Sequence, residues 1–289
     1  MNGERDPNNA YIPEHTVREF SHFTLYKDTP KNPSNHLIPV LIVPGFASSA
    51  ASFELLASTL NEHGFTTIRI EYNFGRPGEP RKWLMFPDVS KLKQQSIVAA
   101  IQSEGQSLTK EGPKQVIAVT HSKGALDVAR VAIEYPEFFQ DMTIFMDAPS
   151  NLCPRPSLVG AINKLRKSNH QDGLDKTRLA TERGETVTEL VQANNAFAHR
   201  YGGIHRLMDI ASSAWGSAYG LLPKLKENRI GTVIIAHTED AFNSPESFDP
   251  VRDRIDRIVT LPGIHGAIKF VQEASEMITE LLEHHEAAA

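Results

Sequence analysis

The chain has 289 residues, of which 40% are hydrophobic and 22% charged, a balance typical of a globular protein with a large buried core. The formal net charge of −5 argues against a nucleic-acid-binding surface. Cys153 is the only cysteine, so we expect neither an intrachain disulfide nor a cysteine-based metal site. The amino terminus lacks the apolar core of a signal peptide, and no apolar run reaches the roughly 18 residues of a membrane helix. We therefore expect a cytoplasmic protein without a transmembrane segment.

The hydrophobic pattern alternates between short β-branched runs and amphipathic stretches. Residues 1–17 are polar and are expected to form a flexible tail. In chain order, the patterns then predict one or two edge strands around 20–25, a strand at 37–43, a helix at 52–62, a strand at 66–72, a helix at 89–107, a strand at 116–120, a helix at 126–135, strands at 142–146, 230–236 and 255–261, and a final helix at 268–282.

Strands that alternate with helices indicate a doubly wound α/β fold with a mostly parallel sheet. Residues 150–228 interrupt this alternation with a helical pattern, and they are too many for a plain connection. We expect them to form a helical cap inserted after the strand that ends near Asp147, on a core made of residues 18–149 and 229–289.

A sharp turn is predicted between the strand at 116–120 and the helix at 126–135, with Ser122 at its apex. Side chains two residues before and after such an apex crowd one another, so small residues are favoured there. Gly124 meets this demand, whereas Thr120 departs from the usual Gly-x-Ser-x-Gly pattern.

The turn resembles the nucleophile elbow of the α/β-hydrolase family, in its serine esterase and lipase branch with an inserted cap. Two later motifs extend the resemblance: Asp240 follows the strand at 230–236, and His265 lies in a Pro-Gly-x-His-Gly segment before the last helix. The order Ser, Asp, His along the chain is the order that this family uses. The resemblance implies that Ser122 is the nucleophile, His265 the general base and then acid, and Asp240 the orienting acid of a catalytic triad.

The choice of the acid stays open between two strand ends. Glu239 lies beside Asp240, and Asp147 follows the strand at 142–146, where some branches of the family keep their acid. We favour Asp240 and retain Asp147 as the alternative acid.

Three further polar residues need an interpretation. His121 is the sequence neighbour of Ser122, so its side chain should point elsewhere and act as a packed or hydrogen-bonding neighbour rather than as the base. Asp127 is expected to be a surface or capping carboxylate, and His237, at a strand end, stays ambiguous.

An ester hydrolase also needs N–H groups that stabilise a developing oxyanion. The resemblance assigns these donors to the backbone N–H groups of Lys123, just after the serine, and of Phe46, in the Pro44-Gly45-Phe46 turn after an early strand. The ammonium group of Lys123 is expected to lie in solvent.

The resemblance implies hydrolysis of carboxylic esters, as in esterases and lipases, without a cofactor or a metal ion. The substrate would be a small ester or acyl compound with an apolar acyl group, since the predicted cap is rich in apolar side chains. The same triad could instead serve lactone, thioester or C–C hydrolysis or acyl transfer, and a non-catalytic binding module is the alternative from another class. Haloalkane dehalogenases and epoxide hydrolases are disfavoured, because they carry Asp at the position of Ser122.

Overall fold

The structure is a computed structural model. It describes residues 13–31, 38–45, 48–73, 86–108, 115–150, 152, 174, 177–178, 180–182, 184, 186, 218–240, 243–269 and 271–286.

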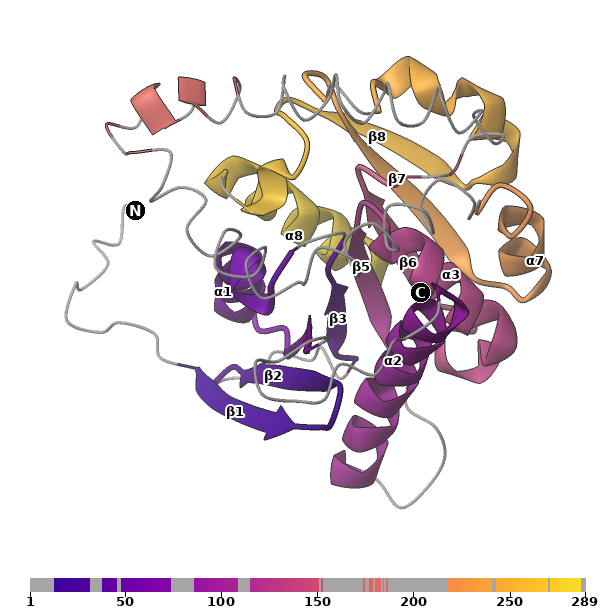
Figure 1. The fold of residues 1–289 in the computed structure, drawn as a ribbon. Helices are drawn as coiled ribbons and strands as arrows, with labels where there is room; N and C mark the ends of the chain where they lie inside the picture. Colours follow the sequence, from indigo (N-terminus) through magenta and orange to yellow (C-terminus); the bar gives the residue numbers. More distant parts are fainter. Residues whose placement is uncertain are drawn as a thin grey trace.

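Eight strands in the described part of the chain form one sheet with the order β1-β2-β4-β3-β5-β6-β7-β8 (Figure 1). The hairpin of β1 and β2 pairs antiparallel with β4, and all other neighbours pair in parallel. The strands are β1 (Glu14–Glu19), β2 (Phe23–Thr29), β3 (Val40–Val43), β4 (Thr67–Tyr72), β5 (Ile117–His121), β6 (Thr143–Asp147), β7 (Gly231–His237) and β8 (Arg257–Leu261).

Helices cover both faces of this sheet (Figure 1). Helices α1 (Glu54–Glu62) and α8 (Gln272–Glu286) pack together on one face, and α2 (Phe86–Leu108), α3 (Gly124–Glu134) and α7 (Leu222–Glu227) pack on the other. Short 3₁₀ helices are η1 (Ala50–Phe53), η2 (Pro136–Phe138), η3 (Pro245–Arg254) and η4 (Ala267–Lys269).

The core is divided into two layers by the sheet because successive side chains of a strand point to opposite faces. In β3, Leu41 and Val43 pack on the side of α2 and α3, whereas Val40 and Ile42 pack on the side of α1 and α8. Strands buried on both faces read as continuous apolar runs, which explains why the sequence reveals β3 and β5 so clearly.

The predicted doubly wound, mostly parallel α/β fold is confirmed, with differences at the element boundaries. Strand β1 begins at Glu14, inside the range expected to be a flexible tail. Its side chains are almost all exposed and polar, so no apolar alternation marks it, and its backbone pairing with β2 defines it instead. The predicted helix at 268–282 is divided, because η4 ends at Lys269 and α8 begins at Gln272.

The predicted cap at 150–228 lies largely outside the described residues, and it stays a prediction. Its described carboxyl-terminal part belongs to the core: Leu222 and Leu225 of α7 are fully buried against α3 and β7. Tyr219 and Leu221 also pack against this core.

Candidate active site

Ser122 occupies the sharp turn between β5 and α3, as the sequence predicts. Its φ angle is +51°, a left-handed conformation that costs a non-glycine residue free energy. Its backbone N–H donates to the carbonyl oxygen of Asp147 at 2.9 Å, and this bond helps to hold the strained turn. Ser122 remains partly exposed although its neighbours His121 and Lys123 are buried.

Two glycines allow the backbone to approach this turn closely. A Cβ atom on Gly124 would lie 2.6 Å from the carbonyl oxygen of Val43. A Cβ atom on Gly45 would lie 2.7 Å from the carbonyl oxygen of His121 and 2.9 Å from Cβ of Ser122. Such contacts are far shorter than packing allows, so only glycine fits, and the segment after β3 lies directly against the serine turn.

Thr120 stands where the usual pattern has glycine, and the structure gives its side chain a place. Thr120 is fully buried, and its hydroxyl donates to the carbonyl oxygen of Phe145 in β6 at 3.3 Å. A buried hydroxyl with a partner avoids the cost of an unsatisfied polar group, so the turn accommodates threonine here.

His265 and Asp240 meet at the carboxyl ends of the strands. Nδ1 of His265 lies 2.9 Å from Oδ2 of Asp240, and the other carboxylate oxygen of Asp240 accepts the backbone N–H of Asn243 at 3.1 Å. The Asp240 side chain is fully buried, whereas that of His265 is 16% exposed. A carboxylate only accepts hydrogen bonds, so Nδ1 of His265 carries the proton of this bond and Nε2 is the basic atom of the neutral ring.

The segment after β8 brings His265 next to the serine turn. Strand β8 is the edge strand of the sheet, three positions from β5, yet the ring centroids of His265 and His121 are only 4.9 Å apart. Since His121 directly precedes Ser122, the ring of His265 lies near the serine turn at the carboxyl edge of the sheet.

Asp147, the predicted alternative acid, is bound to two other histidines. Its Oδ2 lies 2.7 Å from Nδ1 of His121, and its Oδ1 lies 2.6 Å from Nε2 of His237. All three side chains are almost completely buried. Both oxygens of Asp147 are thus occupied by histidines other than His265, and the carboxylate that contacts His265 is that of Asp240.

The three buried groups differ in charge. Burial disfavours ionisation of Asp147, but the charge of His237 and the hydrogen bonds from both rings lower the pKa of this carboxyl well below its usual range. Burial and the nearby ammonium of Lys269 lower the pKa of His121 to about 3. Burial also acts to lower the pKa of His237, yet Asp147, Asp240 and the backbone of Pro262 raise it above its ordinary value. At neutral pH, His121 is therefore neutral, whereas the raised pKa of His237 favours its protonated form.

Two expectations for the neighbours of Ser122 are wrong. The ammonium of Lys123 does not lie in solvent: its side chain is 2% exposed and lies 3.6 Å from the carboxylate of Asp127, which is 1% exposed. Asp127 is therefore neither a surface nor a capping residue. The two residues lie one helical turn apart at the amino end of α3, and the sequence pattern did not reveal that these positions are buried.

The remaining predicted residues are placed as follows. Glu239 forms an exposed ion pair with Arg178, so it is turned away from the contact between Asp240 and His265. The backbone N–H of Lys123 lies at the amino end of α3, where helices favour negative charge. Phe46, the other predicted oxyanion donor, lies outside the described residues.

Lys269 is a residue near this site that the sequence does not single out. Its Nζ donates to the hydroxyl of Ser48 at 2.9 Å and lies 5.4 Å from the centre of the Phe53 ring. Because η4 directly follows the His265 segment, Lys269 links that segment to the segment after β3. In the sequence it is one lysine of an amphipathic stretch, which carries no signal of such a contact.

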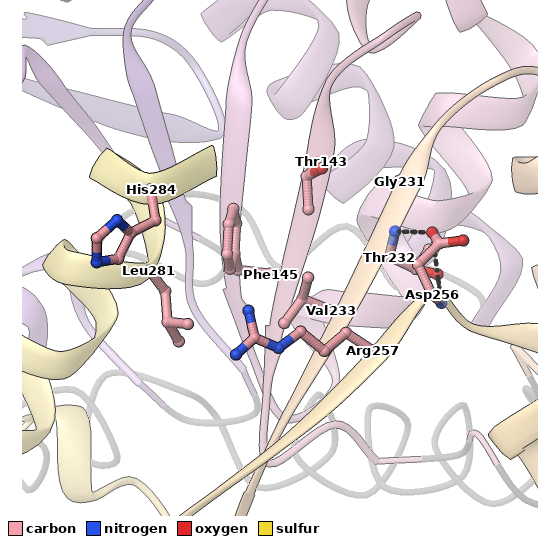
Figure 2. A pocket seen from close by; sticks show the side chains of 9 residues that line it. All are labelled: Thr143, Phe145, Gly231, Thr232, Val233, Asp256, Arg257, Leu281 and His284. Carbon is pink, nitrogen blue, oxygen red and sulfur yellow. Dashed lines mark hydrogen bonds between the residues drawn. The ribbon is translucent and has the colours of Figure 1, made fainter. Parts of the chain in front are cut away.

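A cavity of about 440 Å³ lies at the opposite end of the strands. Figure 2 shows it between α8, which contributes Leu281 and His284, and the amino-terminal parts of β6, β7 and β8. Thr143, Gly231 and Arg257 are the first residues of these strands. None of the predicted site residues lines this cavity, since they lie at the carboxyl ends.

Among the described residues, no group of three or more His, Cys, Asp or Glu side chains is arranged to hold a metal ion. Within the same part of the chain, no helix combines the length and the apolar character needed to cross a bilayer.

Comparisons with known proteins agree with this architecture. No protein-family model matches the sequence, and no curated protein matches it. Among solved structures, a lipase (lip1) described as putative, from Acinetobacter baumannii AYE, matches with a TM-score of 0.64 and 13% identity over 96% of this chain and 93% of that one. The thioesterase domain from the curacin biosynthetic pathway matches with a TM-score of 0.62 and 16% identity over 94% and 99% of the two chains.

An epoxide hydrolase from Vigna radiata, VrEH1, matches about as well, with a TM-score of 0.61 and 14% identity over 96% and 99% of the two chains. Proteins with different reactions thus share this architecture. The structural similarity therefore defines the fold, whereas the reaction has to be inferred from the side chains of the site. The chain has the α/β-hydrolase fold.

Proposed function

We propose that this protein is a serine hydrolase that cleaves carboxylic esters through an acyl-enzyme on Ser122. His265 acts first as general base and then as general acid, and Asp240 orients its ring. The hydrogen bond of 2.9 Å between His265 and Asp240, beside a serine held at φ +51°, is the observation that most strongly supports this proposal.

That hydrogen bond supports the role of His265 through the position of its proton. With Nδ1 donating to Asp240, Nε2 of the neutral ring can accept the proton of a serine hydroxyl. A hydroxyl is a weak nucleophile near neutral pH and needs such a base. The buried carboxylate of Asp240 then stabilises the imidazolium ion that forms.

In the proposed reaction, Oγ of Ser122 attacks the carbonyl carbon of the ester while its proton moves to Nε2 of His265. The tetrahedral intermediate collapses, the bond to the alkoxy oxygen breaks, and His265 gives the proton to the departing alcohol. A water molecule, deprotonated by His265, then attacks the acyl-enzyme and releases the carboxylic acid and free Ser122.

The backbone N–H groups of Phe46 and Lys123 are the proposed donors to the oxyanion of each tetrahedral intermediate. The tight approach of Gly45 to Ser122 supports this assignment, because Phe46 directly follows Gly45. The position of Lys123 at the amino end of α3 supports it further.

The proposed substrate is a small ester with an apolar acyl group, covered by a helical cap at residues 150–228. Lactone or thioester hydrolysis, C–C bond hydrolysis and acyl transfer use the same proton transfers, and both a thioesterase domain and a lipase are among the structural neighbours. A panel of activated esters of increasing acyl length, with matched thioesters, lactones, C–C substrates and alcohol acceptors, separates these reactions by their relative kcat/KM.

Reaction with a fluorophosphonate probe, followed by peptide mapping, tests the nucleophile and its activation together. We expect one labelled peptide that contains Ser122, and no labelling or ester hydrolysis in a folded Ser122→Ala variant. His63→Asn is the matched control, since His63 also contacts a carboxylate, that of Glu283, but lies on the surface between α1 and α8. An unlabelled wild-type protein would indicate a non-catalytic binding module, and label on another residue would refute the role of Ser122.

A further inference from the structure

The proposed reaction uses Ser122, Asp240 and His265, but three buried polar groups beside them remain without a role. His121, Asp147 and His237 come from the ends of β5, β6 and β7 and form one continuous hydrogen-bonded cluster. A buried carboxylate between two buried imidazoles is costly to assemble, because each group loses its hydration. Such a cluster therefore needs a physical explanation of its own.

His121 is the member of this cluster that faces the proposed base. Its ring lies 4.9 Å from the ring of His265, with 52° between the ring planes. On its two edges it meets glycines: a Cβ atom on Gly45 would lie 3.3 Å from Cδ2, and one on Gly266 would lie 3.4 Å from Cε1. The imidazole thus fills the space between the segment after β3 and the segment that carries His265.

The orientation of the His121 ring is fixed by its hydrogen bond to Asp147. Because the Asp147 carboxylate only accepts hydrogen bonds, Nδ1 of neutral His121 must carry its proton, and ring flips or the other tautomer would break the 2.7 Å contact. His237 holds the second oxygen of Asp147 at 2.6 Å, so the carboxylate is itself unable to rotate. All three side chains are almost completely buried, and the two hydrogen bonds restrict the orientation of the His121 ring.

We propose that His121, anchored by Asp147 and His237, is a positioning residue: its neutral imidazole is a rigid wall that holds the His265 ring in line with Ser122. This inference rests on the proposed function. It assigns to Asp147, which is not the proposed orienting acid, the indirect role of fixing the tautomer and the plane of His121.

The charges around His121 agree with this role. Asp147 from β6 is the carboxylate that faces it, and Lys269 from η4 and His265 from the preceding segment are the cationic or titratable groups on its other sides, with the Phe53 ring of η1 at 5.9 Å. A charged His121 would repel the imidazolium that forms on His265 during the reaction, whereas a neutral ring does not. Because its pKa is lowered to about 3, His121 is also a much weaker base than an ordinary histidine and competes poorly for the proton of Ser122.

Nitrogen-15 NMR of the histidines in the full-length wild-type protein tests the state of His121 directly. We expect His121 to keep its proton on Nδ1 and to remain neutral from about pH 8 down to about pH 5, a range in which an ordinary histidine titrates. Assignment of the resonance follows from its disappearance in His121→Asn. A proton on Nε2, or titration of His121 within this range, would overturn the proposal.

Steady-state kinetics test whether His121 and Asp147 affect the alignment of His265. The amide nitrogen of His121→Asn can still donate to Asp147, but the wall against His265 is lost, and Asp147→Asn removes the carboxylate while keeping its shape. In both variants we expect kcat to fall about 10- to 100-fold with KM changed less than about twofold, since only the alignment of the base is disturbed. The fluorophosphonate labelling rate should fall by the same factor, and His63→Asn should match the wild type.

A folded His121→Asn protein with kcat within about twofold of the wild type would refute the positioning role. So would a loss that is fully explained by the fraction of unfolded protein, measured by the thermal midpoint of each variant. If the wild type itself is not labelled, the proposed function fails instead, and the NMR result still decides whether His121 is locked.

Discussion

The backbone N–H of Ser122 donates to the carbonyl oxygen of Asp147 at 2.9 Å, so the end of β6 supports the strained turn at the end of β5. The side chain of the same aspartate holds His121. One residue of β6 thus fixes both the backbone of Ser122 and the side chain before it. Several properties of the turn can be tested separately from catalysis.

Because the backbone at Ser122 is strained, we expect Ser122→Gly to be more stable than Ser122→Ala, the reverse of the usual order for glycine and alanine. A left-handed backbone penalises any residue with a Cβ atom, and φ is +51° at Ser122. Ser122→Gly should therefore have a free energy of unfolding about 1 kcal/mol larger than Ser122→Ala, although glycine normally lowers stability. Urea denaturation of the two proteins measures the difference. An alanine variant as stable as the glycine variant would show that the turn is unstrained.

The close contact at Gly124 predicts that a single methyl group disrupts the turn. A Cβ atom there would lie 2.6 Å from the carbonyl oxygen of Val43 and 3.0 Å from that of Pro44, and backbone atoms cannot move aside as a flexible side chain can. We expect Gly124→Ala to lower the free energy of unfolding by about 2 kcal/mol or more.

Gly220→Ala is the control for this prediction, because nothing among the described residues lies within 4 Å of a Cβ atom at Gly220. Its unfolding free energy should change by no more than about 0.5 kcal/mol. Equal changes in unfolding free energy for the two substitutions would mean that the backbone at the end of β3 does not pack closely against the serine turn.

The sequence predicts the sheet well because its central strands are buried on both faces. β3 and β5 are fully buried, so they appear in the sequence as largely apolar runs. Strand β1 could not be predicted in this way because it is polar and exposed. Its pairing with β2 depends on backbone hydrogen bonds, which leave no pattern in the side chains.

For the candidate site, the sequence predicts positions along the chain better than partners in space. That Asp240 and His265 follow strand ends could be read from the pattern, and the structure brings them into contact. The contacts of Asp147 with His121 and His237 could not be predicted from the sequence, because they join residues 26 and 90 positions apart. The burial of Lys123 with Asp127 likewise depends on how distant segments pack around the start of α3, which the local sequence does not reveal.

The charge states of the buried cluster predict how stability depends on pH. The pKa of His121 is about 3 in the folded protein, against about 6.5 in the unfolded chain. Its contribution to stability is present above pH 6.5 and is lost as the pH falls towards 3, because only the unfolded chain then binds the proton. His121→Asn should therefore make the acid-side fall in unfolding free energy shallower, by up to about 1.4 kcal/mol per pH unit.

His237 contributes with the opposite sign. Its pKa is raised in the folded protein, so its contribution is fully present below the unfolded value of about 6.5 and is lost as the pH rises through the folded value. His237→Gln should flatten the alkaline side of the stability curve and leave the acid side as it is. Urea denaturation at a series of pH values distinguishes the two variants, and parallel curves for both variants and the wild type would contradict the assigned charge states.

The ion pair of Lys123 and Asp127 predicts strong coupling between the residue just before α3 and a residue of its first turn. Both side chains are almost fully buried, with Nζ of Lys123 3.6 Å from Oδ2 of Asp127, so a single substitution removes an ion-pair partner from a buried charge. We expect Asp127→Leu and Lys123→Met each to lower the free energy of unfolding by about 3 to 5 kcal/mol, and the double variant to regain most of this loss. A double-mutant cycle from denaturation curves measures the coupling. Additive losses would show that the two charges are hydrated separately, which would place the start of α3 outside the core.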